Sequence, residues 1–203
     1  MRALAVLFVF AALATPVLAQ DMPSATGFYI QAYGGLRVPD NLLFDGTATD
    51  LGIGTTFGAS VGIDTSVPGL SGELDYMRSS ANYSGLGTAL DSQSLMVDAT
   101  YAPQLGAGLM VQPYVGAGLG AVAVTYKDSA SGIAPAFQLK AGVSGAITGN
   151  LSWFGEYRYQ QAFGQVGVGA DTAEYASHSI VGGLKIDFGG GASPSYGGYN
   201  SGY

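Results

Sequence analysis

The chain has 203 residues, enough for one domain, and it carries few charges: charged residues make up 10% of it, and its formal net charge is −7. An acidic chain lacks the basic surface that phosphate backbones require, so we exclude nucleic acid as a partner. The mean hydropathy of +0.28 argues against disorder and, with 33 glycines, is unusual for a soluble domain. The absence of cysteine excludes disulfides, thiol catalysis and cysteine-ligated zinc.

Residues 1–19 have the features of a secretory signal peptide. Arg2 provides a minimal basic start, residues 3–14 form an uninterrupted apolar run, and small residues precede a cleavage site after Ala19. An uncleaved anchor helix is the alternative, but the run is shorter than the ~20 apolar residues that a spanning helix needs. We therefore expect a signal peptide over 1–19 and a short linker over 20–26.

Eight segments of alternating apolar and polar residues follow the linker. The clearest is 177–188, where Leu184 and Phe188 share an apolar face while Lys185 and Asp187 occupy the other. A soluble sandwich strand over a core is the alternative, but this composition favours an antiparallel strand whose apolar face meets lipid. The predicted strands cover residues 27–37, 55–64, 70–78, 92–102, 111–126, 136–147, 151–161 and 177–188.

The segment 111–126 has an ambiguous phase. Its glycines alternate with larger residues, and small side chains suit crowded positions inside a barrel. We expect Val115, Ala117, Leu119, Ala121 and Ala123 to face outward, with Gly116, Gly118 and Gly120 inward.

The connections between the segments alternate in length. Residues 38–54, 79–91 and 162–176 are long, 127–135 is of modest length, and 65–69, 103–108 and 148–150 are short. Long loops on the outside and tight turns in the periplasm are typical of outer-membrane barrels. The sequence therefore predicts an all-β fold, an eight-stranded antiparallel up-and-down transmembrane β-barrel over residues 27–188, with both termini periplasmic.

Aromatic residues on the apolar faces divide between the two ends of this barrel. Amphipathic rings concentrate at membrane interfaces, and a soluble barrel has no reason to sort them in this way. The sequence thus predicts two aromatic girdles, formed by Phe28, Tyr101, Trp153 and Phe188 at the periplasmic end and by Phe57, Tyr76, Phe137, Tyr157 and Tyr159 near the outer end.

Four motifs together resemble those of a known family: Gly-Phe-Tyr-Ile-Gln-Ala-Tyr-Gly-Gly at 27–35, Gly-Glu-Leu-Asp-Tyr at 72–76, Pro-Tyr-Val-Gly-Ala-Gly-Leu-Gly at 113–120, and the closing strand ending at Phe188. The chain resembles the small eight-stranded outer-membrane barrels of the OmpA/OmpX and opacity-protein class of Gram-negative bacteria, often called the porin family. The resemblance implies residence in the outer membrane, contact with its lipid and lipopolysaccharide, and insertion by the barrel-assembly machinery through the closing strand. A departure from the family pattern is the tail of residues 189–203, rich in Gly, Ser and Tyr, which we expect to be disordered in the periplasm.

The polar faces of the predicted strands carry charges of both signs. In a narrow barrel such charges must pair, because side chains fill its interior and exclude bulk water. We interpret them as a polar core that holds the barrel rigid; the alternative is an ion path along Glu73, Lys140, Glu156 and Arg158. The predicted lumen charges are Arg37, Glu73, Asp75, Asp98, Lys140, Glu156, Arg158, Lys185 and Asp187.

His178 is the only histidine, and it bears on whether the chain is an enzyme. A hydrolase would need a His–Ser pair with an orienting acid. By parity His178 faces outward, while Ser177 and Ser179 point the other way. We expect no enzyme activity, no cofactor and no metal site, since the sequence also has no phosphate-binding loop, Rossmann fingerprint or metal-ligand cluster.

The predicted outer loops are acidic, and their only notable cation is Lys127. Their spacing does not match a calcium loop, and loops on a rigid scaffold often carry binding specificity. We expect a structural outer-membrane barrel whose acidic loops serve surface interaction, with a host or other surface ligand, and envelope integrity; the alternative is a small porin-like channel for ions or small solutes. The loop acids are Asp40, Asp45, Asp50, Asp91, Asp128, Asp171 and Glu174.

Overall fold

The computed structural model describes residues 27–39, 42–44, 47–49, 52–82, 89–103, 105, 111–126, 130–168 and 171–188. Among these residues, no helix is long and apolar enough to cross a membrane. The predictions of a signal peptide, a linker and a tail lie outside the described residues, as do those made for Asp40, Asp45, Asp50, Asp128 and Lys127.

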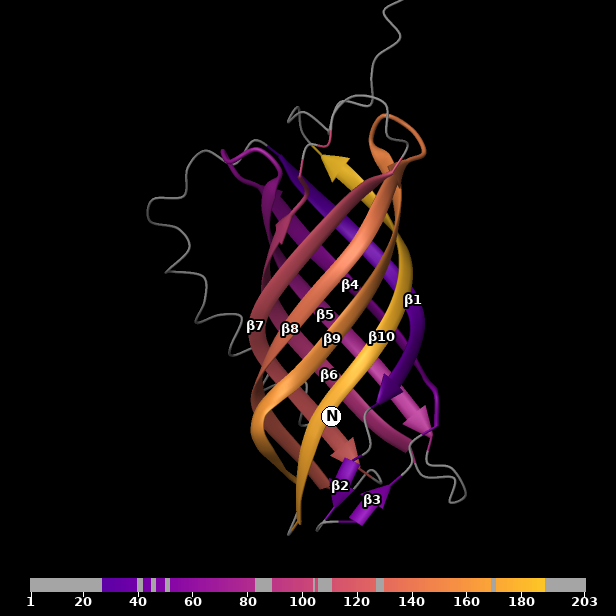
Figure 1. Ribbon diagram of the computed structural model, residues 1–203, viewed down its shortest axis with the longest axis vertical. Coiled ribbons are helices and arrows are strands. Elements are labelled where there is room, and N and C mark those ends of the chain that lie inside the picture. The colour runs from indigo at the N-terminus through magenta and orange to yellow at the C-terminus, as the bar shows by residue number, and fades with distance from the viewer. Residues whose placement is uncertain are drawn as a thin grey trace, which may run out of the picture.

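The described part of the chain forms one antiparallel sheet of ten strands, shown in Figure 1. The strands are β1 (Phe28–Pro39), β2 (Leu42–Phe44), β3 (Thr47–Thr49), β4 (Gly54–Asp64), β5 (Leu70–Asn82), β6 (Ala89–Tyr101), β7 (Gln112–Tyr126), β8 (Ala130–Ala146), β9 (Leu151–Val168) and β10 (Asp171–Phe188).

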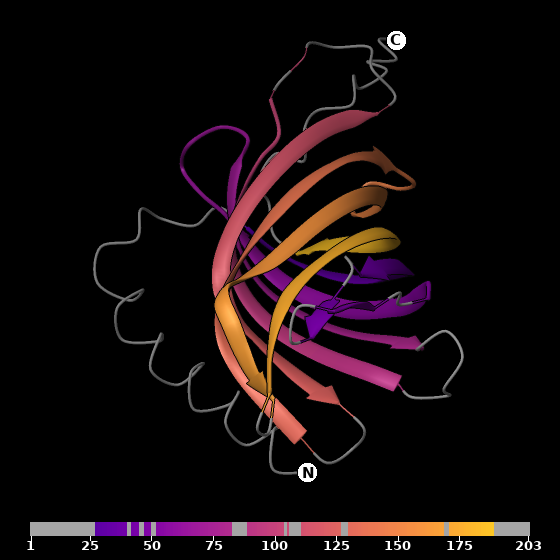
Figure 2. The same ribbon diagram turned by 60° about the horizontal axis from the view of Figure 1, so that its bottom comes forward.

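The sheet closes on itself because β1 pairs with both β4 and β10. The seam with β10 runs from Phe28 opposite Phe188 to Pro39 opposite Ser177. The short hairpin of β2 and β3 joins β10 through one pair, Ala173 opposite Phe44. Leaving this hairpin out, eight of the ten strands form the closed wall, which curves around the interior in Figure 2. The predicted eight-stranded barrel is confirmed.

Successive residues of each strand point alternately into and out of the barrel, because side chains alternate across a strand. In β4, Phe57 and Val61 are exposed on the outer surface, whereas Thr56 and Ser60 are buried. In this strand the apolar half of the alternating pattern therefore lies on the outside, and the polar half faces the interior.

Tight turns join the strands at the end of the barrel where Phe28 and Phe188 meet, which we call the terminal end. In the turn after β4, Thr65 donates its backbone N–H to Leu70 O at 3.0 Å, and Gly69 has a φ of 79°. A side chain at Gly69 would also overlap the carbonyl oxygen of Ala102. Glycine is required here for both reasons. We call the opposite end, where β2 and β3 lie in Figure 1, the far end.

The longest strands extend past the predicted boundaries at the far end. Residues 162–176 were expected to form a loop, yet β9 continues to Val168 and β10 begins at Asp171. Between the pairs Gln161–Ala176 and Gln165–Glu174, β9 has three residues opposite Tyr175 alone, and Gly164 in this bulge has a φ of 80°. A bulge interrupts the alternation, which is why this part of the strands was missed.

Other predicted loops are also shorter than expected. Part of 38–54 forms β2 and β3, β5 continues to Asn82, and β6 begins at Ala89. β8 begins at Ala130 and contains Pro135, which lies just beyond the last pair with β9, Ala136 opposite Ala162. A proline is tolerated there because that edge of the strand has no ladder to interrupt.

The predicted phase of β7 holds over most of its length. Val115 and Leu119 are exposed, and Gly116, Gly118 and Gly120 take the inward parity. Ala123, expected to be exposed, is only 5% accessible. In the register it lies between Gln93 and Ile133, whose side chains are larger than its own.

Candidate functional site

The candidate site is the interior of the barrel, where the structure buries seven of the nine predicted lumen charges. Six of them gather on the inward faces of β5, β6, β8 and β9, and we call this group the charge layer. Its members are Glu73, Asp75, Asp98, Lys140, Glu156 and Arg158.

Lys140 bridges two carboxylates of the charge layer. Its Nζ lies 3.2 Å from Glu73 Oε1 and 3.0 Å from Asp98 Oδ2. The glycine that faces Asp98 on the next strand, Gly118, makes room for this arrangement, because a Cβ at that position would overlap the Asp98 carboxylate. Small residues in β7 therefore leave space for the charges on both neighbouring strands.

Arg158 binds the other two carboxylates. Its Nη1 lies 2.7 Å from Asp75 Oδ2, and its Nε donates to Glu156 Oε1. The same Nη1 donates to the hydroxyl of Tyr33 at 2.6 Å, and that hydroxyl donates to Asp75 Oδ1 at 2.9 Å. The guanidinium also lies over the Tyr33 ring, 3.9 Å from its centre. Such a network constrains each side chain from several directions.

Apolar side chains pack beside the charge layer. Tyr33, Met77, Phe154 and Val181 form a buried cluster, with Tyr114 packed against it. Phe154 meets Tyr33 edge-on, with ring centres 6.4 Å apart. These residues were not among the predicted site residues, although their inward parity in the strands places them in the lumen. Together with the ion pairs, they occupy the middle of the barrel.

Toward the far end, the inward polar residues of β5 and β6 are neutral instead of charged. Following β5, the inward residues run from Glu73 and Asp75 through Met77 to Ser79, and β6 carries the same order in reverse. Beyond the charge layer, buried hydroxyl residues and one cation, Arg37, lie among buried apolar residues such as Val122 and Val124. We call the hydroxyl residues together with Arg37 the hydroxyl layer. It consists of Thr56, Ser79, Ser92, Ser94, Tyr175, Ser177 and Ser179 around Arg37.

Two glutamines connect the layers. Gln138 Nε2 lies 3.1 Å from Asp98 Oδ2, and Gln160 Nε2 lies 3.5 Å from Gln138 Oε1. The Tyr175 hydroxyl then donates to Gln160 Oε1 at 2.9 Å. A continuous series of buried polar contacts thus runs between the two halves of the lumen.

The two remaining predicted lumen charges, Lys185 and Asp187, lie closer to the terminal end than the charge layer does. Lys185 and Asp187 pair with each other at 3.1 Å near the terminal end, where their side chains keep 25% and 21% exposure. Lys185 Nζ also lies over the Tyr29 ring, 4.2 Å from its centre. They are not brought into the charge layer.

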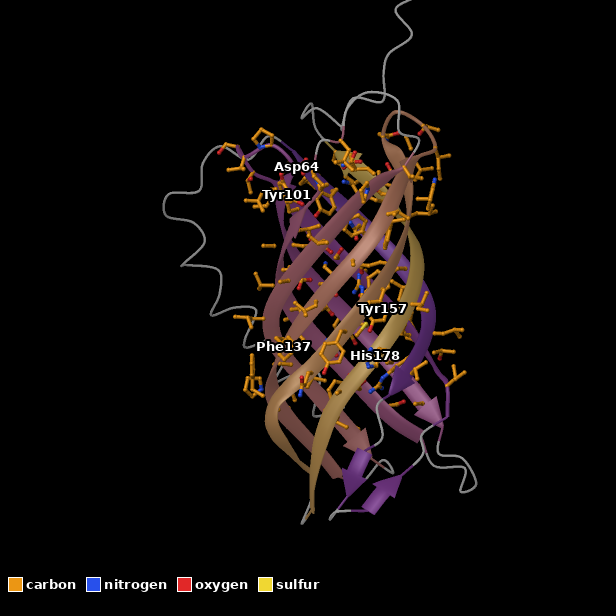
Figure 3. All side chains as sticks on the ribbon, viewed as in Figure 1. Asp64, Tyr101, Phe137, Tyr157 and His178 are labelled. Atoms are coloured by element: carbon orange, nitrogen blue, oxygen red, sulfur yellow. The ribbon has the colours of Figure 1, made fainter. Side chains whose placement is uncertain are left out.

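The aromatic residues predicted to form girdles lie on the outer face. Phe28 stacks on Phe188 across the seam with ring centres 4.9 Å apart. In Figure 3, Tyr101 lies near the terminal end, whereas Phe137 and Tyr157 lie farther from that end, around the middle of the barrel. The exposed members are Phe28, Phe57, Tyr101, Trp153, Tyr157 and Phe188, while Tyr76, Phe137 and Tyr159 are half-buried.

His178 belongs to this outer surface. Its Nδ1 forms a hydrogen bond of 2.5 Å with the Tyr157 hydroxyl, and its ring centre lies 5.0 Å from that of Tyr159. Phe163, which lies in a segment predicted to be a loop, packs against Phe137 in the same group. The neighbouring Ser177 and Ser179 are buried in the lumen, on the other side of the wall. In the described residues no group of three or more His, Cys, Asp or Glu is placed to hold a metal ion.

Comparison with known proteins agrees with this architecture. Neisserial surface protein A matches with a TM-score of 0.63 and 22% identity, over 79% of this chain and 97% of its own. The outer membrane protein AlkL, solved in lipid bilayers, matches with a TM-score of 0.50 and 17% identity, over 86% and 96% of the two chains. The attachment invasion locus protein Ail of Yersinia pestis, solved with the heparin analogue sucrose octasulfate, has a TM-score of 0.46 and 13% identity, over 80% and 99%.

These likenesses concern the fold. Among curated proteins, no match is found. The model of the outer membrane protein β-barrel domain, in contrast, matches residues 4–197, nearly the whole chain. The protein therefore belongs to the family of outer-membrane β-barrel proteins.

Proposed function

We propose that the protein is a structural barrel of the outer membrane with a closed lumen, which holds acidic loops at the cell surface. The observation that carries this proposal is the charge layer, in which Lys140 and Arg158 are buried and each is paired with two carboxylates. Separating a buried ion pair is costly, so the layer resists hydration and keeps the wall rigid.

The loops then provide the contact with the environment. The segments that join β1 to β4, β5 to β6, β7 to β8 and β9 to β10 all leave the barrel at the far end. They contain Asp40, Asp45, Asp50 and Asp128, while Asp91, Asp171 and Glu174 lie near the far ends of β6 and β10. We propose that this end faces outward, with both termini in the periplasm, and that the loops bind a surface ligand or, through divalent cations, lipopolysaccharide phosphates. The closing strand is the segment through which the assembly machinery recognises the chain.

Planar-bilayer recording tests the closed lumen. The purified barrel should give no steady conductance, and the Lys140→Met and Arg158→Met variants should open transiently if they fold, because the remaining carboxylates attract water. The Lys185→Met variant is a matched control, since its ion pair lies outside the charge layer. Steady single-channel currents from the unmodified monomer would overturn the proposal.

A second candidate function is a small channel for ions. The observation that favours it is that each cation is shared, so that Arg158 can keep one carboxylate while it releases the other. This function predicts voltage-dependent currents in the unmodified protein and solute flux into proteoliposomes. The absence of both the currents and the solute flux would exclude the channel function.

The loops are tested separately from the lumen. Deleting residues 40–50 should abolish surface binding or antigenicity, whereas the barrel should still fold and keep its shifted migration in unboiled gels. A variant that replaces only the acids of this segment with amides separates charge from loop length. If both variants bind as the unmodified protein does, this loop is not the contact surface.

A further inference from the structure

Arg37 differs from the other buried cations in having no carboxylate partner among the described residues. Its side chain is 1% exposed, and its Nη1 donates to Ser92 Oγ at 2.9 Å. Its Nε is buried without a hydrogen-bond partner. Lys140 and Arg158, in contrast, each contact two carboxylates.

A buried guanidinium without a counter-charge is strongly unfavourable. A lysine or histidine in this position would lose its proton, but arginine keeps its charge at any pH at which proteins fold. The contacts present are a neutral hydroxyl and the Tyr175 ring, whose centre lies 5.1 Å from Arg37 Cζ. Neither carries a full negative charge, so the described residues leave Arg37 without a counter-ion.

The surroundings of Arg37 supply hydrogen-bond donors instead of acids. Ser179 lies opposite Arg37 in the register, and Ser92 and Ser94 lie two residues apart on the inward face of β6. Ser94 Oγ is also buried with no hydrogen-bond partner. Among described acids, Asp91 pairs with Arg78 on the outer face, Asp187 pairs with Lys185 near the terminal end, and the acids of the charge layer are engaged by their own cations.

We propose that the hydroxyl layer binds a small oxyanion of the phosphate or sulfate class, with Arg37 as its counter-charge. The Nε edge of a guanidinium is suited to an oxyanion, and serine hydroxyls rotate to donate to its remaining oxygens. Arg37 takes this role with Ser92, which it contacts, and with Ser94, two residues along the inward face of β6. Because these side chains face the lumen, the ligand is a free anion and not a lipid headgroup.

Side-chain NMR of the full-length mature protein tests the proposal. The chain has four arginines, Arg2, Arg37, Arg78 and Arg158, and signal cleavage would leave three, so their Nε–Hε signals are easily resolved. In maltoside micelles, which contain no phosphate, titration with inorganic phosphate or sulfate should shift the Arg37 signal and leave that of Arg158 in place. Chloride at equal ionic strength should have a weaker effect.

Two variants assign the site. Arg37→Met should remove the shifting signal and weaken phosphate binding by at least about tenfold, because a charge-assisted hydrogen bond is lost. Ser94→Ala, a smaller change that preserves the barrel, should weaken binding by about two- to tenfold. Arg78→Met is the matched control and should leave phosphate binding unchanged.

Three results would overturn the proposal. The Arg37 signal of the unmodified protein could fail to respond to phosphate and sulfate, or could respond equally to chloride, which would indicate a general salt effect. It could instead shift on replacing Asp40, Asp45 or Asp50 by asparagine and remain insensitive to phosphate, in which case a carboxylate of the protein itself is the counter-ion. Saturation by added phosphatidylglycerol, in place of free phosphate, would identify a lipid headgroup.

Discussion

The charge layer and the hydroxyl layer are two halves of one lumen, built on the same strands, and they treat a buried cation in opposite ways. In the charge layer four carboxylates surround Lys140 and Arg158, and Arg158 also contacts the hydroxyl and the ring of Tyr33. In the hydroxyl layer Arg37 has a serine and a tyrosine ring. The first arrangement supplies its own counter-charges, although Arg158 Nη2 is buried without a hydrogen-bond partner, whereas the second requires a charge from elsewhere. We therefore propose that the first half keeps the barrel rigid and that the second half binds a ligand.

The largest expected effect comes from breaking the charge layer. Replacing Arg158 by methionine leaves Asp75 and Glu156 buried without their cation, so we expect the free energy of unfolding to fall by about 3–5 kcal/mol. Urea unfolding of the barrel in lipid vesicles measures it. Lys185→Met, which breaks a partly exposed pair, should lower it by about 0–1 kcal/mol. Equal losses in the two variants would show that burial does not distinguish these pairs.

A smaller loss of stability is expected when a larger side chain is introduced into the charge layer. The Gly118→Ala variant places a methyl group against the Asp98 carboxylate. Such overpacking should cost about 1–3 kcal/mol. The matched control is Gly155→Ala, because a Cβ there meets nothing within 4 Å. Since alanine restricts the unfolded chain more than glycine does, this control should be neutral or stabilising by up to about 1 kcal/mol. Urea unfolding of both variants measures these changes. A loss of stability in Gly118→Ala without a loss in Gly155→Ala would support the assigned packing.

In the hydroxyl layer, we expect replacement of the buried cation to raise the free energy of unfolding instead of lowering it. In buffer free of phosphate and sulfate, Arg37→Met should stabilise the barrel by about 1 kcal/mol, because removing an uncompensated buried charge outweighs the lost hydrogen bond and ring contact. Added phosphate should then stabilise the unmodified protein but not the variant, since only a ligand that binds the folded state raises stability. A strong destabilisation in phosphate-free buffer would mean that Arg37 already has its counter-ion.

The sequence predicts the wall of the barrel better than it predicts the contacts in the interior. Alternation over 177–188, the tight turns and the closing motif were enough for the eight-stranded barrel and the family. The far end was underestimated because the bulge at Gly164 breaks the alternation on which the strand boundaries depend. Parity assigns a face to a side chain but not a partner, since partners depend on register and barrel stagger.

The layers show this limit most clearly. Arg37 and Arg158 have the same residue type and the same inward parity, and both were predicted to belong to one charge network. Only the three-dimensional arrangement places Asp75 and Glu156 beside Arg158 and surrounds Arg37 with hydroxyls. Ser92 and Ser94, like Ser177 and Ser179, lie two residues apart in the sequence, so they indicated a strand face and gave no sign of a shared site.

The smallest expected coupling energy is that of the ion pair between Arg78 and Asp91 on the outside of the wall. Its size also indicates whether this part of the wall lies in lipid or in water. Arg78 Nη2 lies 3.4 Å from Asp91 Oδ2, with side chains 46% and 32% exposed. If this pair lies in water beyond the bilayer, a double-mutant cycle should give a coupling of about 0–1 kcal/mol that falls with added salt. The Arg158–Asp75 cycle should give several times more and little salt dependence. A large, salt-insensitive coupling for Arg78 and Asp91 would instead place this part of the wall within the lipid, because only the exclusion of water makes an exposed ion pair as strong as a buried one.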